Sequence, residues 1–175
     1  GSFEFYEAFQ DAFAGHLKTK RTETSILYRN NGDATFSDVS VECKIVDPGW
    51  SGDASPLDAN NDGWPDLYVL NMQGNDHYFE NVAGKYFVQK DAKVFNKTPW
   101  GSMGIKVFDF DNDGAPDIYV TDMHSDMSVG VNPDQEKLKS RIGWTESFVR
   151  TKGRSIFGNA LFRNSGGGTY DEVSD

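Results

Sequence analysis

The chain of 175 residues is poor in cysteine and contains only Cys43. A single thiol excludes an intrachain disulfide framework and leaves the redox compartment open. We expect Cys43 to be a buried apolar residue. The sequence also lacks an apolar run long enough to cross a membrane, and its first residues lack the apolar core of a signal peptide. We therefore expect no membrane insertion.

Positive charge is scarce as well. The chain has 17 basic and 27 acidic residues, which gives a formal net charge of −10. A nucleic-acid surface needs clustered lysine and arginine, so we expect no nucleic-acid partner. Part of the negative charge lies in two loops that have the pattern of a metal site.

Histidine is limited to three positions, and no serine or cysteine nucleophile motif accompanies His16 or His77. Asp122, His124 and Asp126 alternate, which on an extended strand would place them on one face and build a second metal or substrate site. A solvated loop is the alternative, and we favour it. We expect no catalytic residue.

The two acidic loops are residues 58–66 and 109–117, and they share one order of oxygen-bearing residues. Side-chain oxygens at positions one, three, five and nine can converge on a hard cation, position seven can add its backbone carbonyl, and glycine at position six permits the sharp turn. The candidate ligands are Asp58, Asn60, Asp62, Trp64 and Asp66 in the first loop, and Asp109, Asp111, Asp113, Ala115 and Asp117 in the second. We predict that both loops bind calcium.

Three alternatives to this assignment are an EF-hand or dockerin loop, a magnesium site and a solvated acidic turn. An EF-hand loop closes with an acidic residue at position twelve inside a helix, whereas these loops close at position nine and precede strand-like runs at 67–70 and 118–121. Magnesium demands near-octahedral geometry. A plain acidic turn must account for the same ligand order appearing twice.

The loops belong to a larger repeat, because their first aspartates lie 51 residues apart and their flanks are similar. Runs that indicate a hairpin occur in three copies, at 27–39, 78–87 and 161–173, with Asn-Gly or glycine-rich turns in two of them. One unit therefore consists of a strand, an acidic loop, a second strand and a hairpin. Four antiparallel strands in about fifty residues are typical of a β-propeller blade.

This order of motifs resembles the FG-GAP, or VCBS, repeats of integrin α-chain propellers and of many bacterial surface and secreted proteins. The resemblance spans residues 24 to 175. The sequences of residues 119–127 and 156–164 are similar to those of the branch that accompanies ASPIC/UnbV-type domains. It implies an all-β fold, a partial β-propeller with calcium loops. It also implies a location outside the cell, in the periplasm or at the cell surface, where calcium is plentiful.

The chain departs from a complete propeller, which has four to eight blades. We divide it into an N-terminal amphipathic helix and linker (1–24), the outer hairpin of an incomplete blade (25–46), one blade (47–98) and a second blade (99–175) with a helical insertion at 123–157. These parts cannot close a ring, so we expect further blades or self-association to complete it.

The function implied by the resemblance is an extracellular binding or structural scaffold, as in cell adhesion, with a protein or glycan ligand. The alternative is the propeller part of a polysaccharide-active enzyme. We favour the non-enzymatic scaffold because no acid, base or nucleophile constellation can be assembled from these residues. Tryptophans could stack on carbohydrate, but Trp50 and Trp100 occupy equivalent repeat positions, which favours packing between blades.

Overall fold

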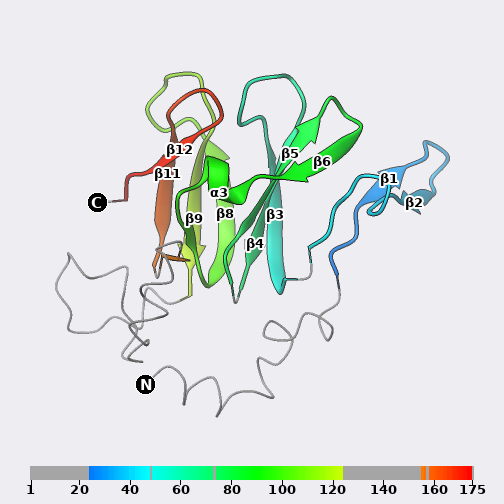
Figure 1. Ribbon diagram of the computed structural model, residues 1–175, viewed down its shortest axis with the longest axis horizontal. Helices are drawn as coiled ribbons and strands as arrows, with labels where there is room; N and C mark the ends of the chain where they lie inside the picture. The colour runs from blue at the N-terminus through cyan, green and yellow to red at the C-terminus, as the bar shows by residue number, and fades with distance from the viewer. Residues whose placement is uncertain (1–23, 48, 73, 124–154, 157, 175) are drawn as a thin grey trace, which may run out of the picture.

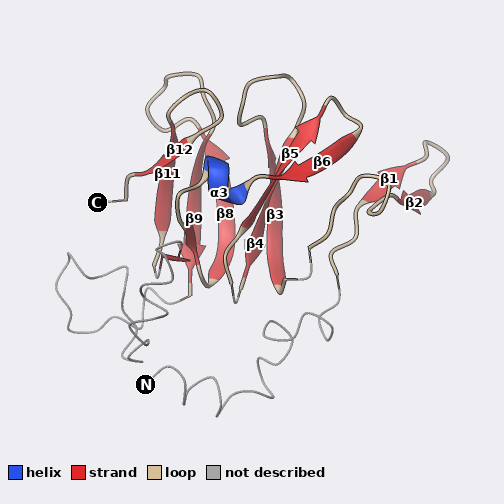
Figure 2. Cartoon of the chain, viewed as in Figure 1, coloured by secondary structure: helices blue, strands red, loops and turns tan. Residues whose placement is uncertain are grey.

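The computed structural model describes residues 24–47, 49–72, 74–123, 155–156 and 158–174. The described residues contain two four-stranded antiparallel sheets that stand side by side (Figures 1 and 2). The first sheet contains β3 (Ser51–Leu57), β4 (Asp66–Asn71), β5 (His77–Val82) and β6 (Tyr86–Gln89), in that order. The second contains β8 (Ser102–Phe108), β9 (Asp117–Asp122), β11 (Ala160–Asn164) and β12 (Tyr170–Glu172).

Four smaller strands and one short helix complete the described part of the chain. A hairpin of β1 (Tyr28–Asn30) and β2 (Phe36–Asp38) precedes the first sheet, and β7 (Thr98–Pro99) pairs in parallel with β10 (Ser155–Ile156). The helix α3 (Asp91–Val94) follows β6. Among the described residues, no helix is long and apolar enough to span a lipid bilayer.

The first two strands of each sheet, with the acidic loop between them, repeat each other at an offset of 51 residues. In the first sheet Ser51 pairs with Asn71, and in the second Ser102 pairs with Asp122. Both first-strand pairings contain a register shift immediately after that serine. Trp50 therefore corresponds to Gly101, not to Trp100, so the equivalence of the two tryptophans that we expected from the sequence is wrong by one residue.

The main core lies between the two sheets, and each sheet contributes a different face. Tyr68 and Leu70 of β4 pack in this core, and so do Ile118 and Val120 of β9. At the 51-residue offset, Ile118 and Val120 correspond to Leu67 and Val69, which lie on the opposite face of the first sheet. The repeats thus stack in one direction, each presenting the same face to the unit before it.

The opposite face of the first sheet carries a second, smaller core. Val69 and Phe79 pack there with Ile45, and the partly buried Leu27 and Cys43 lie against them. The segment that contains β1 and β2 thus covers this face, which explains why β4 is apolar at four successive positions. Cys43 is only partly buried, so our expectation of a buried cysteine is wrong in degree.

The predicted all-β fold with four-stranded antiparallel sheets is confirmed. The helices predicted within 1–24 and 123–157 fall on residues 1–23 and 124–154, outside the described residues. Neither α3 nor the parallel pair of β7 and β10 was predicted. Both are short and depend on tertiary contacts: the Asp91 carboxylate at the start of α3 accepts a hydrogen bond from the Tyr78 backbone at 2.9 Å.

Candidate metal centre

The two acidic loops emerge at the same end of their sheets, each joining the first strand to the second (Figure 1). In the first loop, Asp58 Oδ1 and Oδ2 accept hydrogen bonds from the backbone N–H groups of Asp62 (3.0 Å) and Gly63 (2.8 Å). In the second, Asp109 accepts the corresponding bonds from Asp113 (3.1 Å) and Gly114 (2.9 Å). The first aspartate of each loop therefore folds the loop around itself.

The turn within each loop requires left-handed backbone at the same two positions. The φ angles are 59° at both Asn61 and Asn112, and 86° and 87° at Gly63 and Gly114. Asparagine and glycine tolerate this conformation better than other residues do. The repeated Asn-Asp-Gly sequence thus accounts for the shared loop geometry.

The second loop brings together three of its predicted ligands. One carboxylate oxygen from each of Asp109, Asp111 and Asp117 lies within 4.8 Å of the other two. Calcium binds oxygen at about 2.3–2.6 Å, so oxygens at these separations can share one ion. The fifth-position carboxylate of Asp113 accepts the Ala115 backbone N–H at 2.8 Å instead of joining this group.

The first loop has the same fold with one acidic residue fewer. Its third residue is Asn60, whose Nδ2 donates to Asp62 Oδ2 at 3.0 Å, and Asp62 Oδ1 accepts the Trp64 backbone N–H at 2.9 Å. These contacts bring Asp58, Asn60 and Asp62 into one hydrogen-bonded group. Every candidate side-chain ligand atom at either loop is an oxygen, which suits a hard cation.

The ninth residue of each loop is a buried anchor. Asp66 and Asp117 both have no exposed surface. Asp66 Oδ1 accepts the Asn81 backbone N–H at 2.7 Å, and Asp117 Oδ1 accepts that of Asn164 at 2.8 Å. Burial raises the pKa of Asp66, and hydrogen bonds from Tyr78, Asn81 and Ala59 act against that rise.

The sequence did not single out the two hairpin asparagines, Asn81 and Asn164, as supports of the loops. Asn81 Nδ2 donates to the Pro65 carbonyl at 2.9 Å, and Asn164 Nδ2 lies 3.2 Å from the Ala59 carbonyl in the other sheet's loop. Asn164 thus connects the two units. An asparagine at the equivalent position of all three hairpin motifs was the signal in the sequence that could have identified them.

The two loops differ in how closely the next hairpin covers them. Trp64 lies over the β5–β6 turn, where a Cβ on Gly84 would come within 2.5 Å of the indole ring. The second loop has Ala115 at that position, and a pocket of about 450 Å³ opens there. Arg163 and Asp171 line this pocket beside Asp111. The second loop is therefore the more accessible of the two.

Outside the loops, each boundary between units contains one buried carboxylate and two hydroxyl groups. The first boundary has Ser25, Asp47 and Ser51, and the second has Asp76, Thr98 and Ser102. At the 51-residue offset Ser25 corresponds to Asp76, and Asp47 to Thr98. The carboxylate and one hydroxyl have thus exchanged positions between the two boundaries.

Of these boundary groups, Asp76 is the one whose contribution to stability we expect to depend most strongly on pH. Burial raises its pKa to about 7, although the Asn71 backbone, Ser102 and Tyr68 all donate hydrogen bonds to it. Because the folded-state pKa lies above the unfolded value, the unfolded chain loses this proton first. Stability from this group is therefore lost as pH rises from about 4 to about 7.

We expect Asp76→Asn to flatten the dependence of stability on pH. Between pH 5 and pH 8 the free energy of unfolding of the wild-type protein should fall by on the order of 2 kcal/mol more than that of the variant. Denaturant unfolding at both pH values, with excess calcium present throughout, measures the difference. Parallel pH profiles for the two proteins would show that Asp76 does not titrate in this range.

Asp122 is also structural. It is buried, and its Oδ2 accepts the Gly101 backbone N–H at 2.7 Å while its own N–H donates to Asn159 Oδ1 at 2.9 Å. Its two alternating partners in the sequence, His124 and Asp126, lie outside the described residues. The structure therefore gives Asp122 a role in joining β9 to its neighbours.

Comparison with known protein families agrees with the repeated sheets and loops. The FG-GAP-like repeat family matches residues 10–69 and 58–120, which together cover more than half of the chain. The chain belongs to the FG-GAP-like repeat family, and its stacked four-stranded sheets form a β-propeller-like module. No curated protein matches the chain.

Proposed function

We propose that this chain is a calcium-binding module of an extracellular scaffold, with one ion in each acidic loop. The observation that carries the proposal is the convergence of Asp109, Asp111 and Asp117 in a loop whose residue order and backbone are repeated in the first unit. When bound, calcium would neutralise these carboxylates, whose mutual repulsion otherwise opposes the loop fold. Asp58, Asn60, Asp62 and Asp66 would hold the other ion.

Calcium titration by calorimetry tests the two sites separately. We expect two ions per chain for the wild-type protein and one for either Asp62→Ala or Asp111→Ala, since Asp111 belongs to the converging group of the second loop. These residues suit the test because Asp58 and Asp109 hold the loop backbones, so their removal would damage the fold as well as the site.

Glu42→Gln is the matched control, because it removes one exposed carboxylate remote from both loops and should leave two ions bound. Failure of the wild-type protein to bind calcium would refute the proposal. Retention of two ions by either alanine variant would refute the ligand assignment.

The scaffold part of the proposal rests on a sheet face that the described part of the chain leaves partly exposed. Tyr119, the repeat equivalent of the buried Tyr68, is 36% exposed, and Phe108 on the neighbouring strand is 41% exposed. In the first unit this face packs against the next unit. Further blades, or self-association, would cover it in the same way, and we propose such completion for the assembled protein.

We further propose that the module is non-enzymatic, binds a protein or glycan, and belongs to the ASPIC/UnbV-associated branch. In support of a non-enzymatic role, the buried carboxylates of Asp66, Asp76 and Asp117 each accept at least two hydrogen bonds within the fold. The assignment to this branch rests on the sequences of residues 119–127 and 156–164. The location outside the cell rests on the calcium loops.

A further inference from the structure

One buried carboxylate oxygen in the first unit has no hydrogen-bond partner. The Asp47 side chain is 1% exposed, and its Oδ2 accepts hydrogen bonds from Ser25 Oγ (2.6 Å) and Ser51 Oγ (2.5 Å). Its Oδ1 accepts none. A buried acceptor without a donor is unfavourable, and more so when it carries charge.

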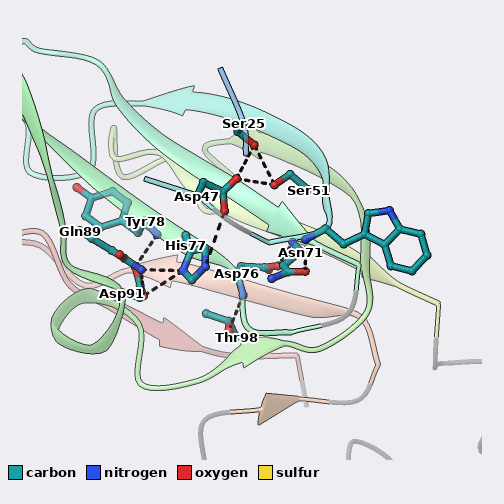
Figure 3. A network of polar contacts seen from close by, with 11 residues as sticks. Ser25, Asp47, Ser51, Asn71, Asp76, His77, Tyr78, Gln89, Asp91 and Thr98 are labelled. Atoms are coloured by element: carbon teal, nitrogen blue, oxygen red, sulfur yellow. Dashed lines mark hydrogen bonds and ion pairs between the residues drawn. The ribbon is translucent and has the colours of Figure 1, made fainter. Parts of the chain in front are cut away.

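The imidazole of His77 lies within ion-pair distance of this oxygen. Its Nε2 lies 3.9 Å from Asp47 Oδ1, and on the other side of the ring Nδ1 lies 3.3 Å from Asp91 Oδ2 (Figure 3). Gln89 Nε2 is 2.8 Å from both Nδ1 and Asp91 Oδ2. The ring, with 22% of its side chain exposed, therefore stands between two carboxylates from different parts of the chain.

The number of protons on the ring decides how many carboxylates it can serve. A neutral imidazole has one N–H and one acceptor nitrogen, so it can donate to Asp47 or to Asp91 but not to both. A charged imidazolium donates from both nitrogens. Protonation thus lets the ring donate towards Asp47 Oδ1 and Asp91 Oδ2 at the same time and places a cation between two anions.

We propose that Asp47, His77 and Asp91 form a proton-operated clasp that fastens residues 24–47 to the first sheet when His77 is charged. Asp47 lies at the end of that segment, shortly before β3 begins at Ser51. Its carbonyl accepts the Ser25 backbone N–H at 3.1 Å, so both ends of the segment meet at this aspartate. His77 begins β5 and Asp91 begins α3, and both therefore belong to the body of the first unit.

The remaining attachment of the segment is small enough for one such contact to matter. Ile45 is the one buried residue that the segment contributes to the second core. The Phe87 backbone N–H donates to the Cys43 carbonyl, the Ser51 hydroxyl bonds Asp47 and Ser25, and Lys44 lies over the Tyr86 ring. A pocket of about 320 Å³, lined largely by apolar side chains such as Leu27 and Leu67, remains between segment and sheet. Packing alone therefore leaves this boundary incomplete.

The charges around His77 favour its protonation. Burial lowers the pKa of the ring, but the hydrogen bond and charge of Asp91 and the charges of Asp47 and Asp76 outweigh it, and the net shift is upward. Stabilisation by the clasp is then complete below the unfolded pKa of about 6.5 and is lost as pH rises through the folded pKa. Burial raises the pKa of Asp76, which precedes His77, to about 7, so its ionisation must be controlled for.

Native-state hydrogen exchange tests the clasp at the backbone amides of Ser25 and Ile45, whose acceptors are the carbonyls of Asp47 and Ser40. After correction for intrinsic exchange, we expect their protection to fall about tenfold between pH 6 and pH 8.5, the effect of losing one charge-assisted hydrogen bond in a largely buried site. The Asn164 amide in the second sheet is the internal reference and should not follow this change.

His77→Gln and Asp47→Asn should each remove the pH dependence at Ser25 and Ile45, whereas Asp76→Asn should retain it. NMR titration of His77 in the wild-type protein provides a readout that does not depend on any variant folding. We expect the ring to titrate above its ordinary pKa, with the same midpoint as the loss of amide protection. The clasp is excluded if protection at Ser25 is independent of pH, if its pH dependence survives in His77→Gln, or if His77 titrates below 6.5.

Discussion

Calcium is expected to raise the Tm of this protein by about 10 °C or more, and a chelator should reverse the effect. Ions that bind only the folded state stabilise it by about 2.7 kcal/mol per site at a hundredfold excess over the Kd, so two occupied loops would contribute about 5 kcal/mol. For a chain of this length, each kcal/mol corresponds to about 2–4 °C in Tm. The physical cause is the repulsion among Asp109, Asp111 and Asp117, whose oxygens lie within 4.8 Å of one another.

Thermal melting with calcium and then with chelator measures this effect. The double variant Asp62→Ala/Asp111→Ala should melt at one temperature in both conditions, while Glu42→Gln should respond as the wild-type protein does. An unchanged wild-type midpoint would contradict the prediction. Each single variant should show a reduced response, because the loops belong to different sheets.

Replacement of Phe95 by alanine is expected to lower the free energy of unfolding by about 3–5 kcal/mol. Phe95 has no exposed surface and lies immediately after α3, between the two sheets. Its ring stacks on Tyr170 (centroids 4.8 Å apart) and makes edge contacts with Tyr68 (5.0 Å), Phe162 (5.3 Å) and Tyr78 (5.6 Å). Two of these partners come from each sheet, so one truncation weakens the packing of both.

Denaturant unfolding of Phe95→Ala beside Phe36→Ala measures this effect. Phe36 is 63% exposed on β2, so its truncation should change stability by less than about 0.5 kcal/mol. A loss below about 1 kcal/mol at Phe95 would show that the surrounding rings close the cavity, and that the aromatic cluster does not join the units.

Local sequence patterns predicted the strands and turns of both units. Asn-Asp-Gly at residues 61–63 and 112–114 requires a left-handed turn, and the β-branched and aromatic runs after each loop favour strands. These signals act over a few residues, which is why they can be recognised without knowledge of the fold. The 51-residue spacing then placed the two loops in equivalent positions.

The burial of each strand could not be predicted in the same way. Tyr68 and Tyr119 occupy equivalent places in similar sequences, yet Tyr68 is fully buried and Tyr119 is 36% exposed. The difference arises because the first sheet is covered on both faces, whereas the described residues cover only one face of the second. Burial depends on which unit follows, and a local pattern contains no information about that.

The sequence by itself determined the repeat, the acidic loops and the order of oxygen donors in them, because these depend on residue type and short spacing. Only the tertiary structure placed Asn164 against the first loop, Phe95 between the sheets, and His77 between Asp47 and Asp91. These contacts join residues that lie far apart in the chain or in different units. They form because the sheets stack, and stacking is set by the complementarity of whole faces, not by any single motif.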